Sequence, residues 1–230
     1  MKSRVRVALI GARGRMGQTI LDLAKNDPKI EIVAQCDLGD AIAAAFKDCD
    51  VAIDFSNAGA VEEVCRAAAQ DGKALVIGTT GHSVEQRHLI EKTAKSLPIV
   101  FASNFSVGVN ALFALTKRAS EILGGEFKPE IVETHHTKKK DAPSGTAKTL
   151  GEILKAELNS EIPIESIREG DVVGDHTVTF VGPSERLELT HRAGSREIFA
   201  SGALRAAEWV VGKPAALYSM QDVLGIALAK

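Results

Sequence analysis

The segment ETHHTKKKDAPSGTA, residues 133–147, brings together side chains that can transfer protons and bind anions. It contains two adjacent histidines, His135 and His136, and three consecutive lysines at positions 138–140. Imidazole and ammonium groups serve as general acids and bases, and both form charge-assisted hydrogen bonds with carboxylates. The segment is therefore the first candidate for a catalytic or anion-binding site.

A turn at residues 141–146 follows the lysines and is expected to begin a helix. Ser144 is a favourable N-cap residue for that helix. Backbone N–H groups at Gly145 and Thr146 would then face an anion at the positive end of the helix dipole. His136 and a nearby lysine would add charge-assisted hydrogen bonds to the same anion. Together these groups predict a pocket for a small carboxylate substrate.

Two other interpretations of the segment stay open. Adjacent histidines lack the i, i+4 spacing of a helical zinc pair, and no cysteine lies nearby, so we expect no metal site. A run of lysines is also typical of a solvated loop without chemical function. The catalytic interpretation requires a hydride donor whose reaction the histidine and a lysine would complete with a proton.

A glycine-rich turn near the N-terminus indicates where such a donor would bind. In GARGRMG the glycines stand at 11, 14 and 17, and Arg13 replaces the second glycine of the common GxGxxG pattern. A strand precedes the turn and a helix follows it. Gly11 would allow the tight turn, and Gly14 would let the backbone approach a pyrophosphate at the helix N-terminus. The alternative is an ordinary strand-to-helix turn.

Asp37 lies 20 residues after Gly17, at the end of the second predicted strand. A carboxylate there accepts hydrogen bonds from ribose hydroxyls and repels a 2′-phosphate, which favours NADH over NADPH. Arg13 and Arg15 could still reach a phosphate, so the preference is modest. An exposed loop acid with no ligand remains the alternative.

The first hundred residues alternate apolar, β-branched runs with stretches of helical spacing, which predicts a doubly wound parallel sheet. The expected strands are Val5–Ile10, Ile30–Cys36, Val51–Phe55, Ala74–Ile77 and Ile99–Ala102. Loops at 78–81 and 102–105 follow two of them, and ligands of such sheets bind at the carboxyl ends of the strands.

The pattern changes after Asn104. We expect a helix at 107–123, a strand at 130–134, a helix after Ser144, and two strands of alternating polarity at 176–181 and 186–191. From about residue 196 the chain is helical again. The predicted fold class is therefore α/β, with a Rossmann-like domain of residues 1–104 and 206–230 and a smaller α+β domain of residues 105–205. The sheet of the smaller domain is mixed or antiparallel.

Composition narrows the class of protein. The chain has 230 residues, 45% of them hydrophobic, and a net charge of −2, which argues against nucleic-acid binding. Cys36, Cys49 and Cys65 form no CxxC pair and are expected to be buried free thiols. No stretch approaches the ~20 apolar residues of a membrane span, and no secretory signal pattern is visible. We expect a cytoplasmic protein.

Taken together, the segments resemble the 4-hydroxy-tetrahydrodipicolinate reductases, also called dihydrodipicolinate reductases, of bacterial lysine and diaminopimelate biosynthesis. The similarity spans nearly the whole chain, and its most specific part is the family pattern E-x-H-H-x-x-K-x-D-x-P-S-G-T-A. The segments that carry it are GARGRMG, VAIDFS, IGTTG, ASNFSVGVN and ETHHTKKKDAPSGTA.

The resemblance implies a role for individual residues. His135 would be the proton donor or acceptor and Lys139 the proton donor, whereas the family pattern does not require Lys138 or Lys140. His136, Gly145 and Thr146 would contact the substrate. The implied cofactor contacts are Gly11, Ala12, Arg13, Gly14, Arg15, Met16, Asp37, Gly78, Thr79, Thr80, Ala102, Ser103, Asn104 and Phe105.

The resemblance also implies an activity and an assembly. The activity is reduction of a cyclic imine dicarboxylate by NADH or NADPH, and the assembly is a homotetramer joined through the sheet of the second domain. Two alternatives stay open: another nicotinamide-dependent amino-acid dehydrogenase, or a non-catalytic NAD-binding sensor that uses the His-Lys loop to bind a partner.

Overall fold

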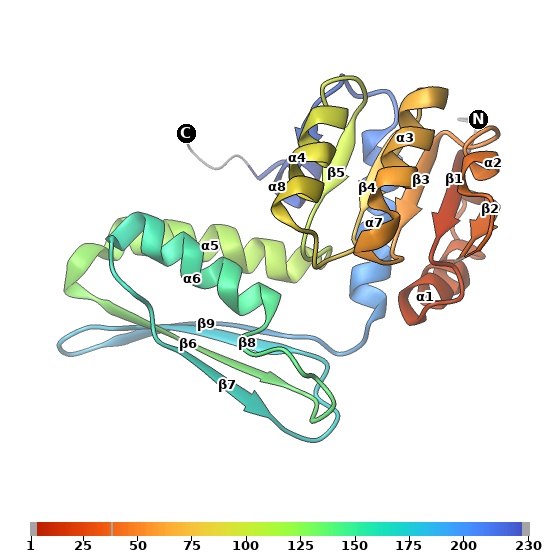
Figure 1. Cartoon of the computed structure of the whole chain (residues 1–230). Helices are drawn as coiled ribbons and strands as arrows, with labels where there is room; N and C mark the ends of the chain where they lie inside the picture. The colour runs from red at the N-terminus through yellow and green to blue at the C-terminus, as the bar shows by residue number, and fades with distance from the viewer. Residues whose placement is uncertain (1–3, 38, 227–230) are drawn as a thin grey trace. The chain divides into compact units, whose positions relative to one another are not determined.

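The structure, a computed structural model, describes residues 4–37 and 39–226 and divides into two compact units (Figure 1). The first unit comprises Met1–Phe105 and Glu197–Lys230, and the second comprises Ser106–Arg196. The first observed boundary lies one residue from the expected 104/105. The second lies at 196/197 instead of the expected 205/206, because an entire helix packs with the first unit.

The first unit is built on a six-stranded parallel sheet in the order β10-β5-β4-β3-β1-β2. Its chain order reverses between β1 and β3, so the switch point of this doubly wound sheet lies at their carboxyl ends. The strands are β1 (Val5–Ile10), β2 (Ile30–Cys36), β3 (Val51–Asp54), β4 (Ala74–Ile77), β5 (Ile99–Phe101) and β10 (Leu217–Tyr218).

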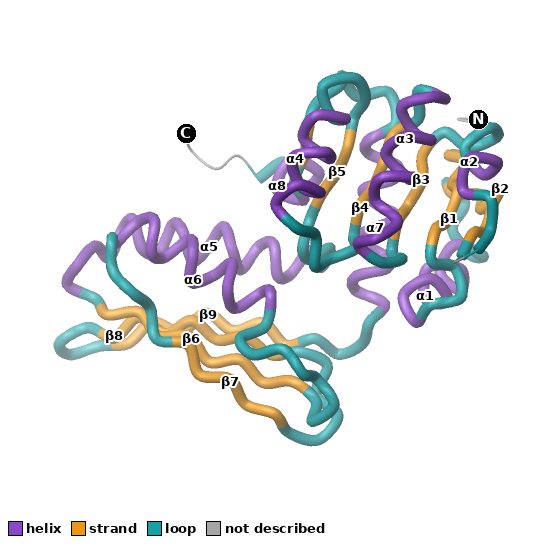
Figure 2. The backbone as a smooth tube through the Cα atoms, in the orientation of Figure 1, coloured by secondary structure: helices purple, strands orange, loops and turns teal. Residues whose placement is uncertain are grey.

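Helices cover both faces of this sheet, which explains the continuous apolar runs of its strands (Figure 2). In β1, Val7 and Leu9 belong to one buried cluster, whereas Ala8 and Ile10 belong to the other. The helical segments are α1 (Arg15–Ala24), α2 (Ile42–Ala45), η1 (Ala58–Ala60), α3 (Val61–Asp71), α4 (Val84–Thr93), α7 (Glu197–Val210) and α8 (Met220–Leu224).

Helix α7 owes its place in the first unit to small residues. Ala200, Ala203, Ala206 and Ala207 are completely buried against this sheet's core. A Cβ atom at Gly202 would lie 1.8 Å from the carbonyl oxygen of Phe105, so only glycine permits this approach. The second domain therefore ends before α7.

The second unit is a two-layer α+β domain. Its mixed sheet has the order β7-β6-β8-β9, in which β6 pairs in parallel with β7 and the other pairs are antiparallel. Ile131, Val178 and Phe180 on one face pack with α5 and α6. The elements are α5 (Val107–Leu123), η2 (Gly124–Glu126), β6 (Lys128–His135), α6 (Gly145–Leu158), β7 (Ile164–Arg168), β8 (Asp175–Val181) and β9 (Arg186–Arg192).

Some features were expected and others were not. The helix at 107–123 and the two alternating strands are confirmed, and the three cysteines are buried and free. Strands β7 and β10 were not predicted, since their runs are short and mixed in polarity. Across the described residues, no helix is both long and apolar enough to span a bilayer.

Candidate active site

The predicted cofactor residues lie together at the carboxyl edge of the parallel sheet, where β1, β2, β4 and β5 end. Gly11 has a φ of 84°, and a Cβ atom there would lie 2.5 Å from the carbonyl oxygen of Phe55. At Gly17 a Cβ atom would lie 2.2 Å from the carbonyl oxygen of Gly11. Both glycines are therefore required by close contacts. Gly14 is the N-cap of α1, and no side chain caps this helix, which suits an anion at its N-terminus.

Asp37 contacts the glycine turn directly. Its Oδ2 accepts a hydrogen bond of 2.7 Å from the backbone N–H of Arg13. The turn is further tied to β2 by the N–H groups of Gly11 and Ala12, which donate to the carbonyl oxygen of Cys36. The carboxylate that was expected to select the ribose is thus held beside the residues expected to bind the pyrophosphate.

Asp54 and Phe55 organise the remaining cofactor loops, although their segment, VAIDFS, supported the family resemblance without indicating a role for either residue. The carbonyl oxygen of Asp54 accepts from the N–H groups of Gly78 and Thr79 at 2.9 and 3.2 Å. The Phe55 ring fills the space beside Gly78, where a Cβ atom would lie 2.2 Å from it, and packs 5.7 Å from the Phe105 ring. Asp54 ends β3 and Phe55 follows it, and β3 pairs with β1, the strand that leads into the glycine turn. This position is the sequence signal that could have identified both residues.

The three lysines of the second unit are not equivalent. Lys138 and Lys140 are exposed, whereas the side chain of Lys139 is only 22% exposed and pairs with both oxygens of Asp141 at 2.9 Å. Partial burial raises the pKa of Asp141, but the hydrogen bond and the positive charge of Lys139 hold that pKa below its usual value. The loop geometry thus separates one lysine from two that face water.

Ser144 caps α6 as expected. Its Oγ accepts from the N–H of Ala147 at 3.2 Å, and Gly145 and Thr146 form the first turn of the helix. The Nε2 atom of His176 lies 3.0 Å from the same Oγ. The helix N-terminus is therefore fixed to the sheet, and its dipole favours an anion beside Gly145 and Thr146.

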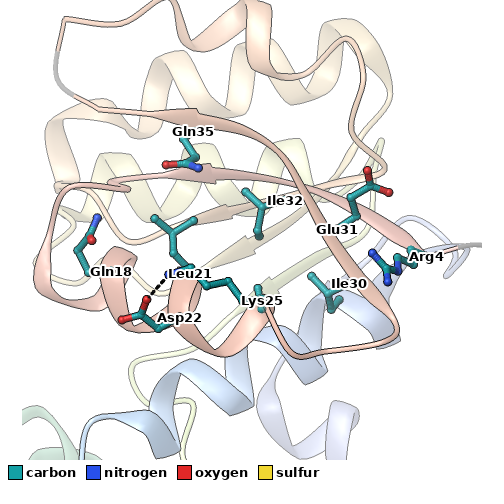
Figure 3. A pocket seen from close by; sticks show the side chains of 10 residues that line it. Arg4, Gln18, Leu21, Asp22, Lys25, Ile30, Glu31, Ile32 and Gln35 are labelled. Atoms are coloured by element: carbon teal, nitrogen blue, oxygen red, sulfur yellow. Dashed lines mark hydrogen bonds and ion pairs between the residues drawn. The ribbon is translucent and has the colours of Figure 1, made fainter.

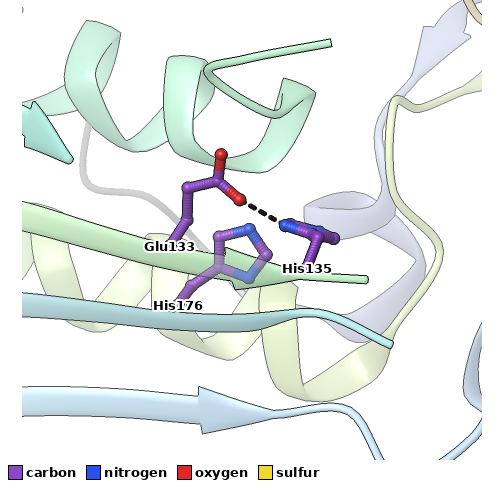
Figure 4. Close-up of side chains that lie close together, drawn as sticks. All are labelled: Glu133, His135 and His176. Carbon is purple, nitrogen blue, oxygen red and sulfur yellow. Dashed lines mark hydrogen bonds and ion pairs between the residues drawn. The ribbon is translucent and has the colours of Figure 1, made fainter. Parts of the chain in front are cut away.

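A buried carboxylate, Glu133, holds His135. The two side chains point toward each other, and His135 Nδ1 is hydrogen-bonded to Glu133 Oε2 (Figure 4). The other oxygen, Oε1, accepts from Arg168 Nη2 at 2.9 Å and from the Ser144 N–H at 3.2 Å. Arg168 also donates to the carbonyl oxygen of Asp141 at 2.5 Å. From the sequence we predicted no role for Glu133, Arg168 or His176, although Glu133 begins the family pattern and shares the apolar phase of β6 with Ile131.

Burial and charge set the ionisation of this pair. Burial favours the neutral form of Glu133, yet the hydrogen bond from Arg168 keeps its pKa below the usual value. Burial lowers the pKa of His135 by more than Glu133 raises it. Near neutral pH the pair is therefore a carboxylate bonded to an uncharged imidazole.

Glu133, His135 and His176 have donor atoms within 4.8 Å of one another, a grouping that could hold a metal ion. Both oxygens of Glu133 and the Nε2 of His176 already make hydrogen bonds, and the Arg168 guanidinium lies on the carboxylate. We therefore interpret the three residues as a hydrogen-bonded network.

A separate cavity of about 330 Å³ lies on the surface of the first unit between α1 and the edge strand β2 (Figure 3). Leu21, Ile30 and Ile32 provide apolar surface there, and Arg4 and Glu31 carry opposite charges. Its lining contains none of the predicted cofactor residues.

The doubly wound sheet with its glycine turn, joined in one chain to a second α+β unit that carries the His-Lys loop, is typical of two-domain, nicotinamide-dependent oxidoreductases. Family models described as "Dihydrodipicolinate reductase, N-terminus" and "Dihydrodipicolinate reductase, C-terminus" match residues 5–105 and 108–224. The chain belongs to the dihydrodipicolinate reductase family.

Individual relatives agree with this assignment. The chain is 47% identical to a 4-hydroxy-tetrahydrodipicolinate reductase of Akkermansia muciniphila, with 96% of this chain and 98% of the relative covered. It is 44% identical to one of Methanoculleus marisnigri, with 96% and 100% covered. Its fold is similar to a dipicolinate-bound dihydrodipicolinate reductase from Paenisporosarcina sp. TG-14, with a TM-score of 0.81, 23% identity, and 97% and 100% coverage.

Because His176 is buried, we expect the stability of the protein to depend on pH. Burial, with a further contribution from His135, lowers the pKa of His176 from 6.5 to about 4. Between these values the unfolded chain binds a proton that the folded chain does not, so stability is present above pH 6.5 and is lost as pH falls toward 4. The loss expected from this residue between pH 7 and pH 4 is about 3 kcal/mol.

Urea unfolding of the wild type and His176→Gln at both pH values measures this contribution. The difference in unfolding free energy between the two pH values should be about 3 kcal/mol smaller in this variant than in the wild type. His88→Gln, on the exposed side of α4, should leave the wild-type difference unchanged. Equal pH dependence in the wild type and His176→Gln would contradict the assignment.

Proposed function

We propose that this enzyme reduces 4-hydroxy-tetrahydrodipicolinate, after loss of water to dihydrodipicolinate, to tetrahydrodipicolinate with NADH or NADPH. The single observation that best supports the proposal is the second unit's loop, in which Lys139, His135 and the capped N-terminus of α6 are fixed by Glu133 and Arg168. The 44–47% identity to two named reductases supports the substrate.

The substrate's two carboxylates match the two anion-binding features of this loop. One carboxylate is proposed to bind the N–H groups of Gly145 and Thr146, which lie at the positive end of α6. The other binds His136 and Lys139. Binding both ends of the substrate fixes the orientation of its ring, so that the reacting carbon is held in place for reduction.

The cofactor site fits a dinucleotide, because Gly11 and Gly17 permit a tight backbone turn that ends at the uncapped N-terminus of α1. When bound, the nicotinamide cofactor supplies a hydride. A two-electron reduction also needs one proton, which Lys139 is proposed to deliver beside the carbon that receives the hydride. His135, whose imidazole is uncharged near neutral pH, is proposed to accept a proton from the reacting substrate and then return it. Lys139 is already oriented by Asp141, and His135 by Glu133.

Other functions make different predictions. A sensor would bind dinucleotide without turning over a cyclic imine, and an amino-acid dehydrogenase would oxidise an amino acid instead. Structures titled as diaminopimelate and aspartate dehydrogenases share the fold at 11–15% identity, which indicates architecture only. The family match and the His-Lys loop favour the imine reductase.

We further propose a homotetramer assembled through the second unit. Helices α5 and α6 cover one face of its sheet, and within the described residues of this unit no element covers the other face. Val132 of the central strand β6 and its neighbour Thr177 of β8 lie on that open face. A second copy of the sheet would bury it.

Replacing either residue proposed to transfer a proton should impair chemistry without impairing cofactor binding. Lys139→Ala or His135→Ala should lower kcat by about 10²–10⁴-fold, the usual contribution of a general acid, with the Kd for NADH unchanged. Freshly generated substrate and nicotinamide absorbance provide the assay, run in parallel with NADH and NADPH. Lys138→Ala is the matched control, because Lys138 is exposed. Turnover of Lys139→Ala equal to that of Lys138→Ala would contradict the role.

Neutralising Asp37 should shift cofactor preference. Asp37→Asn keeps an oxygen for the Arg13 N–H but removes the charge that repels a 2′-phosphate. The ratio of kcat/KM for NADPH to that for NADH should rise roughly tenfold, equivalent to ~1.4 kcal/mol. Steady-state kinetics with both cofactors measure the ratio, and Asp22→Asn, on the exposed side of α1, is the control. An unchanged ratio would argue against ribose selection by Asp37.

The open sheet face should control assembly. Sedimentation velocity of the wild type at micromolar concentration should give four times the mass of one chain. Val132→Lys places a charge on the open face and should shift the sample to smaller species, whereas Leu115→Lys, on the exposed side of α5, should not. A tetramer that survives Val132→Lys would place the interface elsewhere.

A further inference from the structure

We propose that Glu133, held by Arg168, is a positioning residue that fixes His135 in the tautomer with its proton on Nδ1, so that Nε2 is the nitrogen that exchanges protons with the substrate. The geometry of the second unit carries this inference, and it rests on the proposed function only for the identity of the reaction that His135 serves.

The contacts of the carboxylate determine the direction of each hydrogen bond. At Oε1, the Ser144 N–H and Arg168 Nη2 are both donors, so this oxygen must accept twice. At Oε2, the partner is His135 Nδ1. A carboxylate has no proton to give, so Nδ1 must be the donor and Nε2 is left with its lone pair. Glu133 is completely buried, so water does not compete for these contacts.

Gly174 and His176, which lie beside the His135 ring, leave its Nε2 edge available to a substrate. A Cβ atom at Gly174 would lie 2.9 Å from His135 Nε2, so the absence of a side chain there keeps that nitrogen uncovered on one side. The His176 ring packs against His135 in an edge-to-face arrangement, with centroids 5.1 Å apart and planes at 77°. The imidazole is therefore held in one plane with one nitrogen committed to Glu133.

The same contacts predict what Glu133→Gln would do. The amide oxygen must occupy the Oε1 position, because Ser144 and Arg168 both donate there. The amide NH₂ group then faces Nδ1 and donates to it. Nδ1 must become an acceptor, and the imidazole proton moves to Nε2. The substitution preserves the shape of the side chain but reverses the tautomer.

The experiment compares wild type, Glu133→Gln and Glu130→Gln. Glu130 lies on the same strand but is exposed, so its variant should behave as the wild type does. ¹⁵N NMR of the histidine ring nitrogens, with His135→Gln used to assign the signals, should show Nδ1–H in the wild type and Nε2–H in Glu133→Gln. The kcat of Glu133→Gln should fall by about 10²–10⁴-fold, with the Kd for NADH unchanged.

A second variant tests the reactive edge without touching Glu133. Gly174→Ala places a methyl group against Nε2, so kcat should fall at least tenfold while the ring stays in the Nδ1–H tautomer. This variant also decides the inference if Glu133→Gln does not fold. Wild-type kcat in Gly174→Ala, or an Nδ1–H tautomer retained in Glu133→Gln, would overturn the inference. The NMR comparison needs no substrate, so failure of the wild type to reduce the imine would contradict only the proposed function.

Discussion

The arrangement of the second unit depends on one buried carboxylate. Glu133 joins the end of β6 to Arg168 of β7 and to the first turn of α6. A buried charge is costly unless each of its lone pairs is used, and here both oxygens accept hydrogen bonds. This requirement forces the strand, the helix and the loop between them into one geometry. Through Asp141, Arg168 extends the same network to the segment that holds Lys139.

Histidines of the sheet fix the N-termini of both helices of this unit. His176 contacts Ser144 at the start of α6, and His191, its partner across β8 and β9, lies 3.5 Å from Ser106 at the start of α5. Each serine also caps its helix. A positively charged imidazole beside a helix N-terminus would be repelled by the dipole, and burial lowers the pKa of both histidines, so the uncharged form is favoured.

The first unit depends on close contacts at its glycines. Gly11, Gly17 and Gly78 all stand where a Cβ atom would lie 2.5 Å or less from a neighbouring atom. Phe55 lies against two of these positions, so the end of β3 sets the spacing of the loops after β1 and β4. Each unit thus holds one part of the proposed machinery, the first a strand edge with the glycine turn typical of dinucleotide sites and the second the His-Lys loop.

The sequence by itself determined the parallel strands, the main helices and the chemically active segment, because these features depend on local signals. Apolar runs, helical spacing, Ser144 and the glycine turn all act over a few residues. The sequence did not show β7, the end of the second unit at residue 196, or Lys139 as the half-buried lysine. Only the tertiary structure decided these, because they depend on contacts between residues that are far apart in the sequence. Arg168 binds Glu133 from 35 residues away, and a buried charge is stable only where its partners lie beside it.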